Sequence, residues 1–489
     1  MGTLMLQGTG SDVGKSVLVA GLCRLFTNRG LKVRPFKPQN MSNNAAVTVD
    51  GGEIGRAQAL QALACRTDPH SDMNPVLLKP QADRTSQLIV HGKVRGTLGS
   101  GNFRAARGAL LGKVMESYAR LKDSCDLVIV EGAGSPAEIN LRAGDIANMG
   151  FARAAGVPVV LVGDIDRGGV IASLVGTQAV IDAGDNAMIH GFLINKFRGD
   201  AALFADGYHA IERHTGWQGL GVIPWLPGAS RLPSEDAVVL ERPRDSSISR
   251  KIIACPVLPR ISNFDELDPL KLEPGVELAM VVPGHPIPGD ASVIVLPGSK
   301  ATMADLAFMR EQGWEIDLLS HHRRGGLIVG ICGGYQMLGQ TITDPHGIEG
   351  PPGEITGLGL LNVQTVLSPG KALRQIDATA LGVQTTGYEM HMGQTCGAGT
   401  DRPFAVLEDG RTDGAINANG TVMGTYLHGL FASADLRNAL LSRIGISGGG
   451  QDYHAGVDAA LDEIAAQLDN YVDADTLLDL ALSNTAAAT

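Results

Sequence analysis

Two short segments of the 489-residue chain combine residue types that perform chemistry. The first, GTGSDVGKS, is a glycine-rich turn between an apolar run and a helical pattern. Glycines allow backbone N–H groups to surround phosphate oxygens, and a helix N-terminus favours an anion. Lys15 can reach terminal phosphates, and the Ser16 hydroxyl can hold Mg²⁺. The residues that we expect to bind a nucleotide here are Gly8, Thr9, Gly10, Gly14, Lys15 and Ser16.

This turn departs from the standard phosphate-binding loop in its spacing, because five residues rather than four separate Gly8 from Gly14. A metal-binding acid should follow a neighbouring strand, and Glu131 follows four apolar residues in DLVIVEGAG. Asn195, near the end of GFLINKF, can donate to and accept from an adenine edge. We therefore predict ATP as the cofactor, with Mg²⁺ at Ser16 and Glu131.

The second segment, VGICGGYQMLG, places Cys332 in a Gly-x-Cys-x-Gly turn between a strand and a helix. Glycine relieves the clashes of so sharp a turn, and the helix N-terminus favours the thiolate. The N–H of Gly333 is placed to stabilise an oxyanion, with a second donor expected from the turn at Pro297-Gly298-Ser299. This pattern predicts a nucleophilic cysteine.

A thiolate nucleophile needs a base, and the chain has 12 histidines. His428 ends the β-rich run TVMGTYLH, and this strand-end position makes it the predicted base. His391, in GYEMHMG, is the competing candidate. We expect polar, exposed loops for His321, His322 and His346.

The elements that must position these residues follow from hydrophobic patterning. In the first half, short apolar runs alternate with helical patterns, which indicates a doubly wound parallel sheet. The runs are TLMLQG, KVRPFKP, DLVIVEG, VPVVLVGDID and GFLINKF. Beyond a stretch rich in Pro, Ser and charge, the pattern restarts in KIIACPVL, ELAMVVPG, ASVIVLPGS and GLIVGICGG. We predict an α/β fold with a P-loop domain at 1–235, a linker at 236–250, a second α/β domain at 251–445, and a tail at 446–489. The tail should form two amphipathic helices packed on a domain.

Composition excludes several classes of protein. A net charge of −11 argues against a nucleic-acid partner. The six cysteines form no CxxC pair, which argues against a disulfide framework and a zinc cluster. No run reaches roughly 18 apolar residues, and no basic region precedes an apolar one at the N-terminus. We therefore expect a cytoplasmic protein with no membrane partner; its oligomeric state is not predictable from these features.

The loop GTGSDVGKS, Lys37 in FKP and the strand end VEGAG are similar to dethiobiotin synthetase and its relatives among the ATP-dependent amidoligases. In that family the γ-phosphate of ATP activates a carboxylate. The resemblance implies phosphate contacts from Lys15, Ser16 and Lys37, Mg²⁺ binding by Glu131, and adenine binding by Asn195. The family has a further acid for Mg²⁺, for which Asp50 and Glu53 are both candidates.

The second half, from about Lys251 to Arg443, resembles the triad-type (class I) glutamine amidotransferase domain. There the cysteine attacks the glutamine amide, a thioester forms and ammonia leaves. The family has a Glu two residues after the His, whereas this chain has Leu430. Glu389 is a possible substitute, or a Cys–His dyad is sufficient.

The two halves together resemble the corrin-amidating ligases. Six segments are similar to the cobyric acid synthase family: KPQNMSNNAAV, EGAGSPAEINL, DIDRGGVIASLVGT, INKFRGD, IVLPGSKATMADL and YEMHMG. The resemblance implies amidation of the b, d, e and g carboxylates of adenosylcobyrinic acid a,c-diamide, with glutamine and ATP as co-substrates.

A corrin ring with several carboxylates needs amide and cationic donors at its rim. The loops flanking the ATP site offer Gln39, Asn40, Ser42, Asn43, Asn44, Lys79, Gln81 and Arg84. Asp164 and Asp166 follow the strand VPVVLV, so they should lie at the carboxyl edge of the sheet, where they could bind metal or brace the loop.

Three alternatives stay open. Cobyrinic acid a,c-diamide synthase shares both halves and differs in substrate. A P-loop partitioning ATPase would leave the cysteine turn and His428 unexplained. A binding module with an inactive amidotransferase domain is compatible with Leu430, but Cys332 and His428 argue against it.

Overall fold

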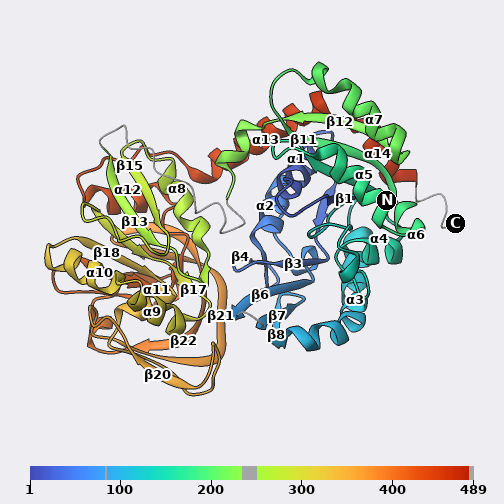
Figure 1. Ribbon diagram of the computed structural model, residues 1–489. Coiled ribbons are helices and arrows are strands. Elements are labelled where there is room, and N and C mark those ends of the chain that lie inside the picture. The colour runs from blue at the N-terminus through green and yellow to red at the C-terminus, as the bar shows by residue number, and fades with distance from the viewer. Residues whose placement is uncertain (83–84, 234–249, 484–489) are drawn as a thin grey trace.

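The computed structural model describes residues 1–82, 85–233 and 250–483, arranged as two α/β lobes side by side (Figure 1). Nearly all of the predicted linker, 236–250, lies outside the described residues, as does Arg84.

The first lobe is built on a six-stranded sheet in the order β12-β11-β10-β1-β9-β2, and every neighbouring pair is parallel. The strands are β12 (Gln218–Pro224), β11 (Ile189–Phe197), β10 (Val159–Asp164), β1 (Gly2–Gly8), β9 (Leu127–Glu131) and β2 (Val33–Phe36). Its helices are α1 (Lys15–Asn28), α2 (Arg56–Ala64), α3 (Ser100–Asp123), α4 (Met149–Ala155), α5 (Val170–Val180), α6 (Ala183–Asn186) and α7 (Ala205–Thr215). Separate apolar cores cover the two faces of the sheet, so the predicted doubly wound α/β fold is confirmed.

An insertion after β2 faces the second lobe. It consists of a four-stranded sheet in the order β3-β6-β7-β8 and a short hairpin, β4-β5. Their bounds are β3 (Gln39–Met41), β6 (Val76–Ala82), β7 (Thr85–Val90), β8 (Lys93–Gly99), β4 (Ala45–Val47) and β5 (Glu53–Gly55). A small apolar cluster joins the two lobes here, since Val47, Leu77 and Ile89 pack against Met390.

The second lobe also contains a mostly parallel sheet, in the order β15-β13-β16-β18-β26-β25, with only β25 antiparallel. The strands are β15 (Val276–Val281), β13 (Lys251–Pro256), β16 (Val293–Leu296), β18 (Leu327–Ile331), β26 (Val422–Thr425) and β25 (Ala415–Ile416). Its helices are α8 (Asp268–Lys271), α9 (Thr302–Glu311), α10 (Trp314–Arg323), α11 (Gly333–Leu338) and α12 (Ala434–Ser442). The four apolar runs predicted as strands in this half are β13, β15, β16 and β18.

A second, largely antiparallel sheet flanks this lobe, and its long hairpin faces the first lobe (Figure 1). It comprises β20 (Gly353–Thr356), β19 (Thr341–Asp344), β21 (Gln364–Ala380), β22 (Val383–Cys396), β27 (Leu427–His428), β23 (Ala405–Leu407) and β24 (Thr412–Asp413). A short pair, β14 (Ile261–Ser262) with β17 (Gly298–Ser299), completes the strands near the cysteine turn.

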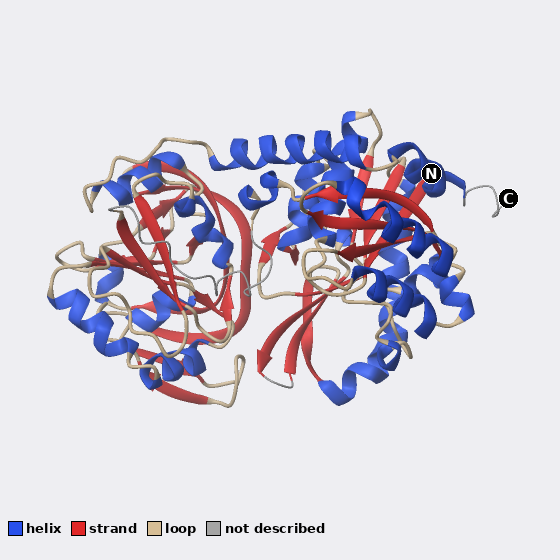
Figure 2. Cartoon of the chain, turned by 45° about the horizontal axis from the view of Figure 1, so that its top comes forward, coloured by secondary structure: helices blue, strands red, loops and turns tan. Residues whose placement is uncertain are grey.

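The two tail helices, α13 (Tyr453–Tyr471) and α14 (Ala474–Ser483), return to the first lobe, as Figure 2 shows for α13 along its top. Helix α1 is apolar on nearly all sides because it is sandwiched between the sheet and α13. Gly21 makes this approach possible, since a Cβ there would lie 2.4 Å from Leu468 Cδ1.

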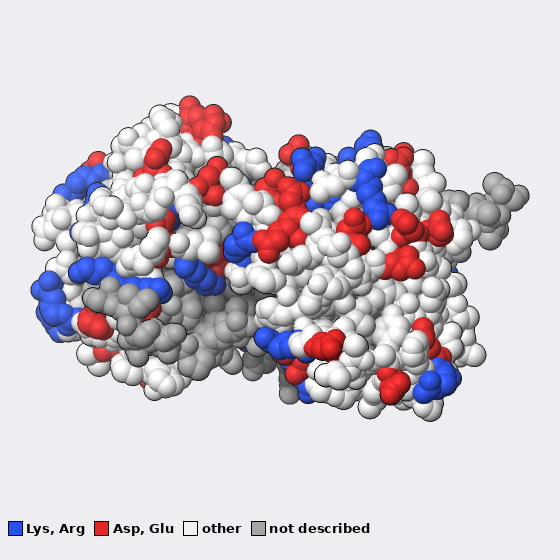
Figure 3. Space-filling model, turned by 90° about the horizontal axis from the view of Figure 1, so that it is seen from above, with Lys and Arg blue, Asp and Glu red and all other residues white. Residues whose placement is uncertain are grey.

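Ion pairs at the edge of this contact support the docking. Buried Arg24 bonds Asp458 (2.5 Å) and Asp462 (3.0 Å), and Arg29 bonds Asp469 and Asp475, each at 2.7 Å. On the face seen in Figure 3, basic and acidic side chains are interspersed over both lobes.

Candidate active site

The predicted phosphate loop joins the end of β1 to the start of α1. The Lys15 ammonium folds back over this loop, donating to the carbonyls of Gly10 (2.7 Å) and Ser11 (3.2 Å), and its side chain is buried. A cation held inside a ring of backbone groups is placed to meet phosphate oxygens.

Three predicted residues from three segments meet beside the loop. Ser16 Oγ donates to Glu131 Oε1 at 2.7 Å, and Lys37 Nζ donates to the same oxygen at 2.8 Å. Burial would raise the pKa of Glu131, but the Lys37 ammonium outweighs it and holds the pKa below the usual value. This carboxylate therefore stays ionised at neutral pH.

The donor set here fits Mg²⁺. A hydroxyl and an ionised carboxylate are hard oxygen ligands, and Mg²⁺ in phosphate-transfer sites takes its other ligands from phosphates and water. Within the described ranges no group of three or more His, Cys, Asp or Glu side chains could hold a metal ion by itself. Ser16 and Glu131 are thus the residues that would hold Mg²⁺ together with a nucleotide.

Neither candidate for a further metal-binding acid faces the loop in the structure. Asp50 accepts from the Ser71 hydroxyl at 2.5 Å, and Glu53 forms ion pairs with Lys79 and Lys371 toward the second lobe. The expectation that one of them binds Mg²⁺ therefore finds no support in the structure, because both carboxylates are engaged elsewhere.

Asn195 lies against the phosphate loop, where its amide donates to the carbonyl of Val13 at 2.8 Å. The two aspartates after β10 brace neighbouring loops: Asp164 pairs with Lys196 (2.8 Å) and Asp166 with Arg198 (2.7 Å). Of the two roles considered for these aspartates, bracing is the one that the contacts support.

The cysteine turn has the strained geometry expected of a nucleophile. Cys332 has φ 54° and ψ −110°, and residues other than glycine rarely adopt such a positive φ. The chain can turn here because Gly334 lies against β16, where a Cβ would be 2.1 Å from the Leu296 carbonyl oxygen. A Cβ at Gly333 would lie 2.9 Å from the backbone nitrogen of Ser299, so the two segments predicted to supply oxyanion donors pack closely beside Cys332.

His428 is buried and stands at the end of β27, where its Nδ1 bonds the carboxylate of Glu266. With Nδ1 engaged, Nε2 is the nitrogen that remains for the Cys332 thiol. Burial alone would lower the pKa of His428, but Glu266 and Cys332 outweigh it and raise the pKa to about 10. Cys332, His428 and Glu266 therefore have the arrangement of a nucleophile, a base and an orienting acid.

The third member of this triad corrects the prediction from sequence. Glu389, the suggested substitute, forms ion pairs with Arg374 and Arg411 instead of contacting His428. Leu430 is part of the apolar core. Glu266 lies far upstream in a one-turn 3-10 helix, Phe264–Leu267, and carries no motif by which the sequence could have identified it.

Of the other histidines, His391 lies in the same pocket as Cys332, with its ring stacked on Tyr426 (centroids 3.8 Å apart). His346 is exposed in a turn, as expected, but His321 and His322 lie in α10. His321 is buried and bonds the carbonyl of Leu327, and burial lowers its pKa.

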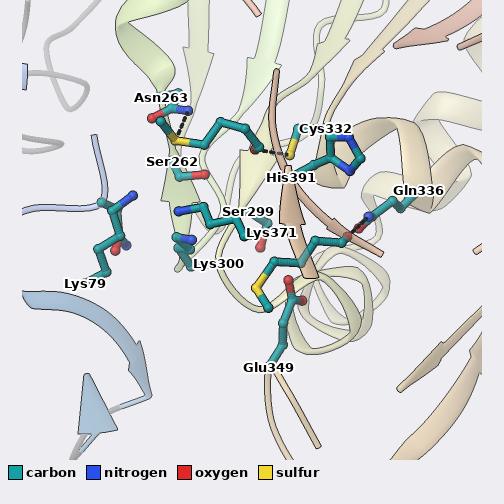
Figure 4. Close-up of a pocket in the computed structure, with 13 residues that line it drawn as sticks. Lys79, Ser262, Asn263, Ser299, Lys300, Cys332, Gln336, Glu349, Lys371 and His391 are labelled. Carbon is teal, nitrogen blue, oxygen red and sulfur yellow. Dashed lines mark hydrogen bonds between the residues drawn. The ribbon is translucent and has the colours of Figure 1, made fainter. Parts of the chain in front are cut away.

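The Cys332 thiol opens into a pocket with walls from both lobes (Figure 4). Asn43 and Lys79 come from the first lobe, and Lys300 and Lys371 from the second. Lys79 is fully buried on β6 and pairs with Glu53, so it does not lie in a loop as the sequence suggested. Burial lowers the pKa of Lys371 to about 8 even with Glu53 beside it.

Other residues expected at the corrin rim are also used inside the protein. Asn40 bonds Gln58 at 3.0 Å, and Ser42 Oγ accepts from the N–H of Asn44. Gln81 reaches the second lobe at the carbonyl of Ile348 (3.4 Å). Asn40 and Ser42 are thus engaged within the first lobe, whereas Gln81 supports the contact between the lobes.

Family models match both halves of the chain. Residues 4–239 match the CobQ/CobB/MinD/ParA nucleotide binding domain, and residues 252–436 match the CobB/CobQ-like glutamine amidotransferase domain. The chain is 71% identical to a cobyric acid synthase of Rhizorhabdus wittichii, with 98% of this chain and 99% of the relative covered. It is 72% identical to one of Sphingopyxis alaskensis over the same shares of both chains. The chain belongs to the cobyric acid synthase family. Members of this family are ligases, and this one carries a nucleotide-binding domain and a glutamine amidotransferase domain, as the sequence predicted.

Two further findings bear on this member of the cobyric acid synthase family. All six cysteines are free, so no disulfide framework exists. In the described part of the chain, no helix has both the length and the apolar character needed to span a membrane.

Proposed function

We propose that this chain is a glutamine-hydrolysing, ATP-dependent ligase that amidates the b, d, e and g carboxylates of adenosylcobyrinic acid a,c-diamide to give adenosylcobyric acid. The observation that carries the proposal is the shared pocket, in which a triad-held thiol in the amidotransferase domain faces Asn43 and Lys79 of the nucleotide-binding domain. The names of the relatives support the choice of substrate.

Ammonia release begins at the thiol. The Cys332 thiolate attacks the carboxamide carbon of glutamine, and the N–H groups of Gly333 and of the Gly298–Ser299 turn stabilise the oxyanion. His428, held by Glu266, donates its Nε2 proton to the leaving nitrogen, so ammonia departs and a thioester remains. Water, deprotonated by His428, then releases glutamate and restores the thiol.

Carboxylate activation takes place at the phosphate loop. A carboxylate oxygen of the corrin attacks the γ-phosphorus of ATP, and ADP leaves. Lys15 and Lys37 hold the phosphate charge, and Asn195 is the adenine contact. Mg²⁺, when bound at Ser16 and Glu131, supplies further positive charge to the phosphates. Ammonia then attacks the carbon of the acyl phosphate, the amide forms, and phosphate leaves.

Mass spectrometry tests the whole reaction. Adenosylcobyrinic acid a,c-diamide is incubated with the enzyme, MgATP and glutamine labelled with ¹⁵N at the amide. Stepwise conversion of the four carboxylates to labelled amides is expected. Glutamate release without any change in corrin mass would reject this substrate, and cobyrinic acid would be the next to try.

A Cys332→Ala variant tests the division of labour between the domains. We expect it to lose glutamine-dependent amidation and to regain activity with ammonium at high pH, because free ammonia then reaches the acyl phosphate directly. Amide formation by the same corrin assay is the readout. Absence of rescue, with ATP binding intact, would contradict ammonia release as the role of Cys332.

A further inference from the structure

Helix α2 contacts both chemical sites of the chain. Toward its C-terminal end, Gln61 donates to Glu131 at 2.5 Å and to the carbonyl of Ser16 at 3.4 Å. At its first residue, the Arg56 side chain leaves the nucleotide-binding domain and enters the amidotransferase domain. Both ends of this nine-residue helix are therefore fixed by functional residues.

The Arg56 guanidinium reaches the surroundings of the triad. Its Nη2 donates to the Tyr388 hydroxyl at 3.0 Å, and its Nε lies 2.8 Å from a carboxylate oxygen of Asp265. Only 19% of the Arg56 side chain is exposed. A buried guanidinium that contacts a hydroxyl and a carboxylate in this way is held in one orientation.

Tyr388 contacts two members of the triad. Its hydroxyl donates to Glu266 Oε1 at 3.2 Å, the oxygen that also bonds His428 Nδ1. Its ring stacks on the imidazole of His428, with centroids 4.9 Å apart and planes 9° from parallel. Tyr388 thus fixes both the plane of the base and the position of its orienting acid.

We propose that Arg56, a residue of the nucleotide-binding domain, is a positioning residue of the glutaminase triad. The proposal rests on the roles proposed above for Cys332 and His428. A hydroxyl has a single hydrogen. Because Arg56 donates to the Tyr388 oxygen, that hydrogen is directed to Glu266. Arg56 also balances the charge of Asp265, the chain neighbour of Glu266.

The consequence is that the triad of the amidotransferase domain is positioned in part by a residue of the nucleotide-binding domain. Ammonia release becomes efficient only while the two domains are docked, which is the state in which the thiol pocket opens toward Lys79 and Asn43. Glutamine hydrolysis in an undocked protein would waste ammonia.

The test uses the full-length chain with Arg56→Gln and Tyr388→Phe. We expect each variant to lower kcat for glutamine hydrolysis about 10–100-fold, as loss of an outer orienting contact does elsewhere, with KM little changed. The double variant should be no slower than the slower single variant, because Arg56 acts on Glu266 through the hydroxyl that Tyr388→Phe removes. Tyr388→Phe keeps the ring stack, so its effect reports the hydroxyl alone.

Arg66→Gln is the matched control, because the Arg66 side chain lies just beyond α2 and is 57% exposed. Its kcat for glutamine hydrolysis should match that of the wild type.

Ammonium-dependent amidation separates positioning from a merely structural role and should be unchanged in both variants. A kcat within twofold of wild type in both would overturn the proposal. The proposal would also be overturned if ammonium-dependent amidation fell as much as glutamine hydrolysis did. Additive losses of kcat in the double variant would overturn it as well. Glutaminase activity that survives in Cys332→Ala would instead reject the proposed function, independently of Arg56.

Discussion

At the scale of single residues, two buried glutamates near the cysteine turn have different roles because different charges surround them. Arg374 and Arg411 neutralise Glu389. Glu266 instead bonds the imidazole of His428 and the hydroxyl of Tyr388. An acid that orients an imidazole must bond its Nδ1, and Glu266 does so.

Replacing Glu266 by Gln should therefore lower kcat for glutamine hydrolysis by about 10²–10⁴-fold, because the base loses its orientation and its charge partner. Glu389→Gln is the control and should retain most of the activity. Glutamate release in steady state measures both. The reverse ranking of the two variants would show that Glu389 supports the base.

The pH dependence of hydrolysis should report the same contact. In the proposed mechanism His428 must be protonated to release ammonia, so activity should be lost as pH rises through its pKa, which lies at about 10 in the wild type. In Glu266→Gln one of the two groups that raise the pKa of His428 is gone while burial remains, so the alkaline limb should move to lower pH. A profile of kcat/KM across neutral and alkaline pH measures this shift, and an unmoved limb would contradict the role of Glu266.

At the scale of elements, strands from both domains close the thiol pocket with buried charges. Glu53 on β5 pairs with Lys79 on β6 and with Lys371 on β21. Burial lowers the pKa of both lysines. We expect these paired charges to hold the two domains together beside the pocket and so to limit the escape of ammonia between them.

Glu53→Gln should loosen this closure, since two buried lysines lose their counter-charge. We expect more ammonia to appear in solution for each amide formed. The ratio of released ammonia to amidated corrin is the measurement, and it does not depend on how much enzyme is folded. Glu116→Gln removes an exposed ion pair with Lys113 and is the control. An unchanged ratio in Glu53→Gln would show that closure does not depend on this pair.

At the scale of the whole molecule, two helices that follow the amidotransferase domain pack on the nucleotide-binding domain. Helices α13 and α14 cover α1 and β1, and Gly221 forms a β-bridge with Val472. Arg24 also donates to the carbonyls of Leu63 and Ala64, so it joins α1, α13 and the end of α2. The nucleotide-binding domain is therefore completed by a segment that follows the amidotransferase domain.

Leu468→Ala should destabilise the nucleotide-binding domain by about 2–5 kcal/mol, the usual cost of truncating a fully buried leucine. Hydrogen exchange followed by mass spectrometry reads each domain separately, and protection should fall in β1 and α1 but not in β16. Leu203→Ala is the control, because Leu203 is 87% exposed. Equal loss of protection in β16 would indicate that the tail stabilises both domains instead.

The sequence by itself determined the two reactive turns and the sheets that carry them. The phosphate loop and the cysteine turn are each formed by consecutive residues, so spacing and glycine content are sufficient to indicate their chemistry. Apolar runs marked five of the six strands of the first parallel sheet, all except β12, and β13, β15, β16 and β18 in the second, because such strands are buried on both faces. Glu131 could be placed beside Ser16 because strand ends meet at one edge of a parallel sheet, whereas Lys37 was indicated by the family resemblance.

Only the tertiary structure decided which distant side chains complete these sites. Glu266 is 162 residues from His428, and Arg56 is 332 residues from Tyr388, separations over which no local pattern operates. The same holds for Glu53, which looked like a metal ligand and is a partner of buried lysines, and for the tail, whose apolar faces did not reveal which domain they cover. Such contacts depend on how the domains pack, and packing is set by surfaces that the chain assembles only when folded.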